Sequence, residues 1–589
     1  MRRIINSLFF LFIFLFSSNL FASELNFHIT LTDDVKYKKN FSNFSYTNNK
    51  AKIGGEISFG VVGNFDSLNP FILKGVSAES LSLLYDSLFV KSLDEIDSAY
   101  PLIAEYYYFD KKEQSLIFKI KNNALWHDGK NITSNDILFT YNILKKYGHP
   151  YYKLILSRIN NVKILNDNNI AYYVDDINDK KLLMTIALLP ILPKHYYANN
   201  QFSDDLLNIP LGSGPYKVDD FQAGRKISYK KFNDYWGKNL NVNKYRYNFN
   251  YIKYNYYRDS NIAIQALKAG EYDLRIENIA KNWANAYDAD FLSKKNFKKL
   301  EIKHKNSTGM QCFVLNNRLD KFKDINFRRA LNLAFNYDWI NKNIFYNSYK
   351  RNNSFFANSI YEAKGDISLF EINYLEERNY NIKNYLTLNN YNADAKISSR
   401  ENLLIARYLL ESSGYKIKNF KLHDKNNNQI KLNFLLTSKS FHRVILPYIN
   451  DLKQLGIDSE VRVVDFSNYQ KLLENFDFDI IVGYFGVASI PGDELKNSWH
   501  SSTANLAGSR NLAGINDNLI DKLIEDILSE NKFNNKLILT RLLDRVLINN
   551  SYIIPHWHIA YHRLIFKDKF TLPYYLPDYA LDFHSWSIK

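Results

Sequence analysis

The sequence predicts a mixed α/β protein with two or three domains, and three observations support this fold class. The chain has 589 residues, which is long enough to bury two or three hydrophobic cores. It contains a single cysteine, Cys312, so burial rather than an intramolecular disulfide must stabilise it. Between residues 431 and 482 the apolar pattern alternates between strand and helix periods, as it does in a parallel α/β sheet.

The first residues are typical of a secretion signal. Arg2 and Arg3 precede an apolar run over residues 8–16, and the small residue Ala22 follows. We expect cleavage near Ala22 and an exported, soluble protein, because no later run approaches the roughly twenty apolar residues of a spanning helix. An uncleaved anchor is the alternative, since Leu20 is bulky for its position two residues before the cut.

The positive charge of the chain is diffuse. The formal net charge is +15, and it becomes +13 when Arg2 and Arg3 leave with the signal. Nucleic-acid binders concentrate such charge in a patch or on one helix face, whereas here lysines are spread among Asn, Ile and Tyr. We therefore expect no nucleic-acid partner, with a mild preference for acidic ligands or anionic surfaces left open.

The first half of the chain predicts a lead-in followed by a small mixed α/β unit. Residues 23–52 are polar and aperiodic, so we expect an extended lead-in with little function. The folded part begins near Gly54 and the small unit ends near Pro210. Thr133 and Asp136 form a capping box, which is typical of a helix start. The expected elements are a strand over 56–62, a helix over 78–89, a strand over 115–120, a helix from about 134 to 147, and strands over 162–165 and 170–174.

The second half predicts a return to sheet structure. The turn at residues 212–215 (GSGP) is a natural boundary, and a helix over 261–268 closes at Gly270. A β-α-β-α-β run follows, with Pro447 inside its first helix, where it predicts a kink or a break. The expected strands are 227–231, 431–437, 461–464 and 478–482.

Standard catalytic signatures are absent from the sequence. There is no P-loop, no G-x-G-x-x-G after a strand, no H-E-x-x-H, no paired C-x-x-C and no G-x-S-x-G. Cys312 lies in a strand-like run, where a buried thiol is commoner than a nucleophile. We expect no enzymatic activity, no catalytic residue and no cofactor. An exported hydrolase is the alternative, and it would need a catalytic pair or triad that the sequence does not display.

A short run of histidines is the best metal candidate. His556 and His558 would share one face of a strand, whereas His558 and His562 would need a helix to share a face. One element therefore cannot present all three imidazoles, and we expect histidines that line or border a cleft, without a metal site. A nickel or haem-type receptor is the alternative.

Six segments, taken in order, carry a resemblance that spans most of the mature chain. They are residues 66–70 (DSLNP), 84–88 (LYDSL), 101–104 (PLIA), 126–130 (WHDGK) with Asn135 and Asp136, 212–216 (GSGPY) and 327–331 (FRRAL). With them the chain resembles the peptide-binding family (family 5) of periplasmic ABC-importer solute-binding proteins. Other segments look like the branch that imports microcin C and other peptides, namely Arg225 and residues 234–236, 248–249, 257–259, 280–283 and 508–512.

The resemblance implies a two-lobed, Venus-flytrap α/β protein of the large type. The expected division, after a signal at 1–22 and the lead-in at 23–52, is a first lobe (53–93, 211–309 and 530–589), its extra subdomain (94–210) and a second lobe (310–529). Such a protein, as a monomer, captures a peptide or peptide-like solute as the lobes close and delivers it to an inner-membrane ABC permease with its ATPase subunits. A sensory protein that docks on a receptor is a further alternative.

The resemblance also implies ligand-binding residues. In the oligopeptide branch an aspartate three residues after a tryptophan holds the amino terminus of the peptide, but residues 484–487 here read YFGV, without that aspartate. Another acid, Asp493 or Glu494, or a ligand with a modified end, is expected instead. The candidate ligand-binding residues are Lys74, Gly75, Val76, Glu277, Asn278, Trp283, Tyr484, Phe485, Asp493 and Trp557, with no metal ligand.

Overall fold

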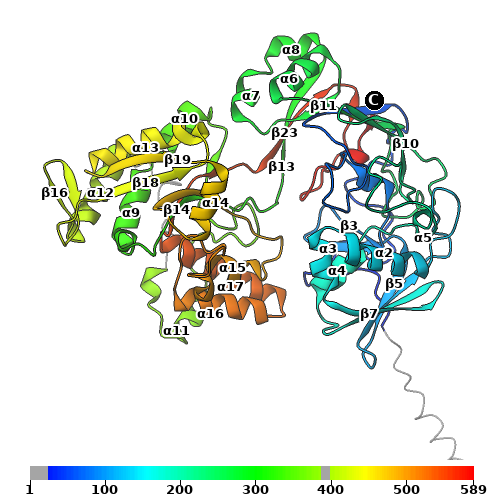
Figure 1. The fold of residues 1–589 in the computed structure, drawn as a ribbon, viewed down its shortest axis with the longest axis horizontal. Coiled ribbons are helices and arrows are strands. Elements are labelled where there is room, and N and C mark those ends of the chain that lie inside the picture. The colour runs from blue at the N-terminus through cyan, green and yellow to red at the C-terminus, as the bar shows by residue number, and fades with distance from the viewer. Residues whose placement is uncertain (1–23, 386–397) are drawn as a thin grey trace, which may run out of the picture.

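A computed structural model describes residues 24–385 and 398–589 of the chain. Figure 1 shows two lobes side by side, with strands β13 (Phe297–Lys303) and β23 (Tyr561–Lys567) where they meet. The predicted signal peptide lies outside the described residues. Within the described residues, no helix combines the length and apolar composition needed to cross a membrane.

The first lobe is built on a seven-stranded mixed sheet with the order β13-β23-β12-β2-β11-β10-β9. Strand β2 pairs in parallel with β11 and β12, and the other pairs are antiparallel. Helix α6 starts at Asp259 and ends at the left-handed Gly270 (φ 86°), as the sequence predicts. The remaining elements are β2 (Glu56–Val62), β9 (Tyr216–Gln222), β10 (Lys226–Lys231), β11 (Tyr251–Tyr257), β12 (Leu274–Ile276), α6 (Ser260–Ala269), α7 (Ala280–Asn285), α8 (Ala289–Lys294), β24 (Phe570–Thr571) and β25 (Ser587–Ile588).

The extra subdomain contains a four-stranded antiparallel sheet with the order β5-β6-β8-β7, and its buried residues share one core with the first lobe. The predicted capping box of Thr133 and Asp136 is present at the start of α2. The elements here are β1 (Ile29–Thr30), β3 (Phe89–Lys91), β4 (Ser98–Pro101), β5 (Ala104–Asp110), β6 (Ser115–Ile120), α2 (Ser134–Tyr147), α3 (Pro150–Leu156), β7 (Ile159–Asn166), β8 (Asn169–Val174), α4 (Lys180–Leu188) and α5 (Lys194–Tyr197).

The helix expected over residues 78–89 is wrong. Only one 3-10 turn, Leu81–Leu84, forms there, and the chain then enters β3. The carbonyl of Leu84, which a continuing helix would use, accepts the backbone N–H groups of Ser213 and Gly214. A tertiary contact with the turn at 212–215 therefore replaces the helical hydrogen bonds that periodicity predicts.

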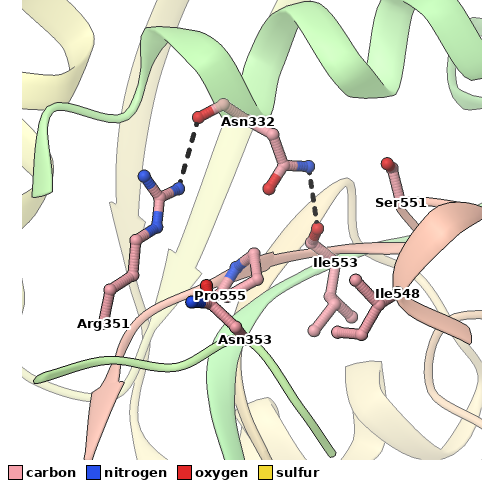
Figure 2. A pocket seen from close by; sticks show the side chains of 7 residues that line it. All are labelled: Asn332, Arg351, Asn353, Ile548, Ser551, Ile553 and Pro555. Atoms are coloured by element: carbon pink, nitrogen blue, oxygen red, sulfur yellow. Dashed lines mark hydrogen bonds between the residues drawn. The ribbon is translucent and has the colours of Figure 1, made fainter. Parts of the chain in front are cut away.

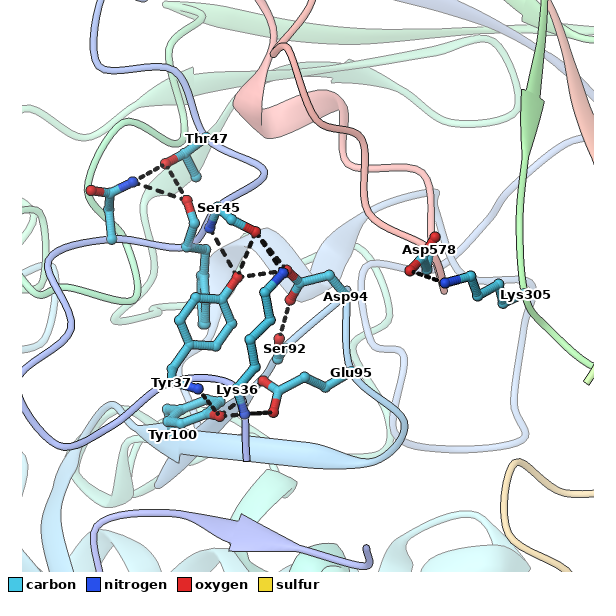
Figure 3. A network of polar contacts seen from close by, with 12 residues as sticks. Lys36, Tyr37, Ser45, Thr47, Ser92, Asp94, Glu95, Tyr100, Lys305 and Asp578 are labelled. Atoms are coloured by element: carbon cyan, nitrogen blue, oxygen red, sulfur yellow. Dashed lines mark hydrogen bonds and ion pairs between the residues drawn. The ribbon is translucent and has the colours of Figure 1, made fainter. Parts of the chain in front are cut away.

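The lead-in, which was expected to be extended, packs closely on the first lobe. Tyr37, Phe44 and Tyr46 are buried in a small core with Tyr100 and Val242. Beside them, Asp94 accepts hydrogen bonds from the side chains of Lys36, Tyr37 and Ser45, a network shown in Figure 3. The composition of residues 23–52 is polar, but its few aromatic side chains bind this segment to the lobe.

The second lobe has a five-stranded sheet with the order β19-β18-β20-β14-β21. The predicted β-α-β-α-β run is present as β18-α13-β19-α14-β20, with β18 parallel to both β19 and β20. Helix α13 contains Pro447. The elements are β14 (Met310–Leu315), α9 (Ile325–Ala334), α10 (Tyr337–Ile344), β15 (Lys350–Arg351), α11 (Leu369–Glu376), α12 (Ser399–Ser412), β16 (Lys416–Lys418), β17 (Lys421–His423), β18 (Lys431–Leu436), α13 (His442–Gln454), β19 (Asp458–Val463), α14 (Phe466–Glu474), β20 (Ile480–Phe485) and α15 (Glu494–Trp499).

The expected division differs from the sheet topology in its last part, and β3 (Phe89–Lys91), which was assigned to the first lobe, pairs with β4 of the extra subdomain. Residues 530–589 were assigned to the first lobe, but α17 (Phe533–Asn549) packs in a core of the second lobe, together with α16 (Asn518–Ser529), which was expected there. Strand β21 (Ile553–Pro555) pairs with β14 in the sheet of the second lobe, and β22 (Trp557–His558) pairs with β15. The chain therefore returns to the first lobe between β22 and β23.

Candidate functional site between the lobes

Two chain segments cross between the lobes side by side. Residues 304–309 lead from β13 to β14, and residues 559–560 lead back from β22 to β23. The N–H of His304 donates to the carbonyl of Ala560 at 3.1 Å, which joins the two crossings. Gly309 has φ +60°, and a Cβ there would lie 2.5 Å from the Phe485 carbonyl oxygen. This position needs glycine because both its backbone conformation and its surroundings exclude a side chain.

Arg563 connects the lobes at these crossings. It lies on β23, is 3% exposed, and its Nη2 donates to the Ser348 carbonyl of the second lobe at 2.6 Å. Its guanidinium is 5.7 Å from the Trp283 ring of the first lobe and 5.6 Å from the Tyr349 ring of the second. The Tyr349 ring is in turn 6.2 Å from that of Trp557. The structure thus brings two candidate residues, Trp283 and Trp557, to one place around a buried cation.

Glu277 lies beside this place, but its carboxylate is already occupied. It is 1% exposed and accepts hydrogen bonds from Arg275 Nε (3.1 Å), the Tyr287 hydroxyl (2.7 Å) and the Ile279 N–H (2.9 Å). These bonds hold the start of α7, which carries Trp283. The next residue, Asn278, is exposed. Of this candidate pair, Asn278 is the one whose side chain is open to solvent.

Trp557 and the neighbouring histidine belong to an aromatic cluster of the second lobe. Trp557 is 9% exposed, and its ring stacks on Phe441 with centroids 6.0 Å apart. His556 is fully buried, and neither of its ring nitrogens has a hydrogen-bond partner. Burial, aided by the charge of Arg351, lowers the pKa of His556 to about 3, so the ring is neutral.

The other two histidines of the run are also neutral. Burial lowers the pKa of both His558 and His562 to about 4. His562 packs against His304 of the first crossing, with ring centroids 4.6 Å apart. Among the described residues there is no group of three or more His, Cys, Asp or Glu side chains that could hold a metal ion. These imidazoles border the crossings, where they pack as uncharged rings.

The buried Arg351 lies on the strand that pairs with the strand of Trp557. Arg351 pairs through its backbone with Trp557, and its Nη2 donates to the Asn332 carbonyl at 3.4 Å. Figure 2 shows this contact together with the bond from the Asn332 amide to the Ile553 carbonyl. Burial lowers the pKa of Arg351 to about 10. Its side chain ties α9 to the strand that carries Trp557, inside the second lobe.

The candidates on β20 differ in exposure. Tyr484 is 55% exposed, and its hydroxyl donates to the Thr308 carbonyl in the first crossing at 3.2 Å. Phe485 is 4% exposed and packs against Phe355 with centroids 5.6 Å apart. Tyr484 therefore presents an aromatic surface to solvent beside the crossing, whereas Phe485 is a core residue.

The loop of Lys74, Gly75 and Val76 is exposed on the first lobe. The Val76 N–H donates to Asp66 Oδ1 at 2.6 Å, so the loop is held by an aspartate of the segment 66–70. Gly75 has φ +80°, and a Cβ there would lie 2.8 Å from the same Asp66 oxygen. The tight turn leaves the side chains of Lys74 and Val76 pointing to solvent.

A second contact between the lobes lies near the last candidate, Asp493. The Ser489 hydroxyl of the second lobe donates to Asp97 of the first. Lys181 Nζ on α4 donates to the carbonyls of Ile490 and Pro491 at 3.3 and 3.4 Å. Asp493 itself is exposed at the start of α15. Sequence reasoning missed Asp97, Lys181 and Ser489, because no local pattern marks contacts between residues that are 309 and 392 positions apart.

Comparison with known proteins identifies the family of this chain. The family model described as "Bacterial extracellular solute-binding proteins, family 5 Middle" matches residues 98–506, which is more than half of the chain. The chain belongs to this family. The members and structural neighbours are binding proteins and not enzymes, so the chain is a solute-binding protein of the family 5 type.

Relatives and a solved structure agree with this assignment. The chain is 31% identical over 576 residues to the "Probable peptide-binding protein YejA" of Agrobacterium fabrum, covering 95% of this chain and 94% of that protein. It is 32% identical over 540 residues to the "Peptidoglycan-binding protein YepA" of the same organism, covering 88% of each. The oligopeptide-binding protein AppA of Bacillus subtilis, solved with a nonapeptide, matches with a TM-score of 0.59 at 19% identity, over 92% of this chain and 100% of AppA.

Proposed function

We propose that this family 5 protein is a periplasmic receptor that captures peptides or peptide-like solutes between its lobes and delivers them to an ABC importer. The observation that carries the proposal is the arrangement around the crossings. The buried Arg563 joins the lobes there, and the exposed Asn278 of the first lobe and Tyr484 of the second lie beside the crossings. A solute that touches both lobes would stabilise their closed arrangement, and the closed form would be the signal for the importer.

The candidate residues divide by exposure into two roles in this proposal. Lys74, Val76, Asn278, Tyr484 and Asp493 are exposed and would contact the solute. The remaining candidates, Gly75, Glu277, Trp283, Phe485 and Trp557, would shape and support the surface that the others present. With few charged groups among the contacts, hydrogen bonds to the peptide main chain and aromatic walls would supply most of the affinity.

Asp493 and Lys74 would orient a peptide bound between the lobes. They are exposed and carry opposite charges on different lobes. A free peptide carries an ammonium group at one end and a carboxylate at the other, so Asp493 would attract the first and Lys74 the second. A solute with a modified amino terminus, as microcin C and related conjugates imply, would depend less on Asp493.

The peptide class is supported by the relatives, and a second candidate comes from one of them. YejA of Agrobacterium fabrum is named as a probable peptide-binding protein and YepA as a peptidoglycan-binding protein, and both cover most of this chain. A short peptide from the cell wall belongs to both ligand classes that these names state, since peptidoglycan contains peptide stems. We keep cell-wall peptides as the second candidate within the same proposal.

Native mass spectrometry of the purified mature protein, before and after denaturation, tests the proposal. Release of a heterogeneous set of peptides supports a broad peptide receptor, whereas one defined conjugate or cell-wall peptide supports a specialised one. A bound metal or haem would contradict the proposal and favour a receptor of that type. The intact mass also gives the mature amino terminus, which we expect near residue 23. Stimulation of the ATPase activity of a co-expressed importer by the loaded protein would separate an importer partner from a sensory receptor.

A further inference from the structure

The first lobe contains a cavity at the sheet edge opposite the crossings. Strands β9 and β10 form one end of the seven-stranded sheet and β13 forms the other, so this edge lies away from the face between the lobes. The cavity, of about 390 Å³, opens where the lead-in meets the loop that joins β10 to β11. A volume of this size accommodates a small organic molecule. Its lining residues are Ala51, Ile53, Pro215, Lys231, Phe232, Asn233, Tyr235, Lys238, Asn239, Asn243, Lys244, Tyr245, Arg246, Tyr247 and Asn248.

The wall of this cavity carries cations without acids. It contains Lys231, Lys238, Lys244 and Arg246, and no aspartate or glutamate. Arg246 is compensated by Asp582, whose Oδ2 lies 3.3 Å from Arg246 Nε. No ion pair joins the three lysines to a carboxylate of the described residues. The cavity wall thus carries an excess of about three positive charges, which favours an anionic ligand.

Lys231 is a charged group of this wall without an anionic partner among the described residues, whereas Arg246 is paired with Asp582 and keeps one unbonded donor. Lys231 is half-buried on β10, and burial together with the nearby charge of Lys238 lowers its pKa. The Arg246 side chain is 6% exposed, and its Nη1 has no hydrogen-bond partner. Burying the charge of Lys231 costs free energy unless an anion pairs with it.

Aromatic and amide groups complete the wall. Phe232, Tyr245 and Tyr247 line the cavity with ring surfaces, and Asn233 and Asn239 add polar side chains. Tyr245 and Tyr247 both have positive φ, 62° and 58°, which bulky residues adopt at a cost. A wall that combines lysine charges with ring surfaces suits a ligand that joins a multiply charged anion to an organic group.

We propose that this cavity binds the phosphate group of a small phosphate ester. Lysine ammonium groups are compact point charges that bind phosphate without a fixed geometry, and a phosphate dianion offsets several of them better than a single carboxylate does. The same group occurs in a soluble phosphate monoester and in the headgroup of an anionic phospholipid. Both sources share the recognition chemistry, and the experiment separates them.

The test uses the full-length mature protein and three probes, namely inorganic phosphate, phenyl phosphate and vesicles of phosphatidylglycerol, with phosphatidylcholine vesicles as the neutral comparison. Isothermal titration and vesicle flotation are measured at low and at physiological ionic strength. The variants are the single substitutions K231Q and K238Q, their combination K231Q/K238Q, and K230Q as the control that removes one charge, as each single substitution does. Lys230 is exposed on the same strand, points to the opposite face and lies outside the cavity, and it carries the same charge as its neighbour.

We expect the wild type and K230Q to bind the phosphate probes with equal affinity. K231Q/K238Q should bind them at least about tenfold more weakly. Binding of the soluble phosphates supports a phosphate monoester, and binding of phosphatidylglycerol vesicles alone supports a lipid headgroup. Bound phenyl phosphate should also protect Lys231 and Lys238, but not Lys230, from chemical acetylation. Mass spectrometry measures the acetylated fraction of each lysine. Absence of binding to all three probes, or an equal loss in K230Q, would overturn the proposal.

Discussion

Replacement of Glu277 by glutamine tests whether its carboxylate supports the fold. The carboxylate is 1% exposed and accepts from Arg275, Tyr287 and the Ile279 N–H, all within 3.1 Å. An amide of the same shape has only one acceptor oxygen and no charge, so Arg275, itself 7% exposed, would remain buried without its partner. Breaking one side of a buried ion pair costs about 3–5 kcal/mol. We expect E277Q to lower the free energy of unfolding by about 3 kcal/mol.

Urea unfolding followed by tryptophan fluorescence measures this change, because Trp283 lies on the helix that Glu277 holds. Asn278→Ala is the matched control, since Asn278 is the exposed neighbour, and it should shift stability by less than about 0.5 kcal/mol. If Glu277 instead served the solute directly, E277Q would weaken peptide binding and leave the unfolding midpoint unchanged. That result would refute the supporting role derived from its hydrogen bonds.

Three further predictions concern the crossings, the second contact and a buried acid. Gly309→Ala forces a Cβ to within 2.5 Å of the Phe485 carbonyl at a φ of +60°, and should destabilise the protein by about 1–3 kcal/mol; an unchanged urea midpoint would contradict this. Lys181→Ala removes the bonds to the Ile490 and Pro491 carbonyls, so we expect a larger radius of gyration in X-ray scattering from the solute-free protein, whereas the exposed neighbour variant Lys180→Ala should match the wild type. Burial raises the pKa of Asp86 to about 7, so its folded state favours the protonated acid. Its contribution to stability is therefore present below pH 4 and is lost as the pH rises through 7, by at most about 4 kcal/mol. Urea midpoints between pH 4 and pH 8 should fall more steeply in the wild type than in Asp86→Asn, and equal slopes would count against the buried acid as the cause.

The segments that carried the family resemblance predicted the fold because they pack against one another. His127 of the segment 126–130 hydrogen-bonds through Nε2 to the Gly214 carbonyl of the segment 212–216 at 2.8 Å. Asp86 of the segment 84–88 accepts from the Tyr235 hydroxyl at 3.0 Å and from Trp236 Nε1 at 2.9 Å. These residues stabilise the packing of the first lobe through hydrogen bonds to one another. They therefore predicted the family and the architecture correctly, but said little about what is bound.

Local signals in the sequence were sufficient for elements that depend on local chemistry. The capping box at Thr133 and the left-handed glycine at Gly270 stand where they were expected, because both act within one turn of a helix. The candidate residues of the site could not be divided in the same way. Whether Glu277 faces solvent or Arg275 is decided by α7 and β12 packing together, and the pattern of residues around position 277 does not encode that choice.

The positions of the two contacts between the lobes give them different roles in closure. Arg563 lies at the crossings, where an opening rotation moves atoms least, so its bond to Ser348 and its contacts with Trp283 and Tyr349 can persist in both forms. The contact of Lys181 involves α4, which Figure 1 places well away from β13 and β23, and that of Ser489 involves Asp97 just before β4. An opening rotation would separate such distant atoms first. Those contacts are few and partly exposed, and each is worth only about 0.5–1.5 kcal/mol. In the proposed mechanism the empty protein would have a small bias between its two forms, and a solute that binds both lobes would shift their populations through an affinity difference of a few kcal/mol.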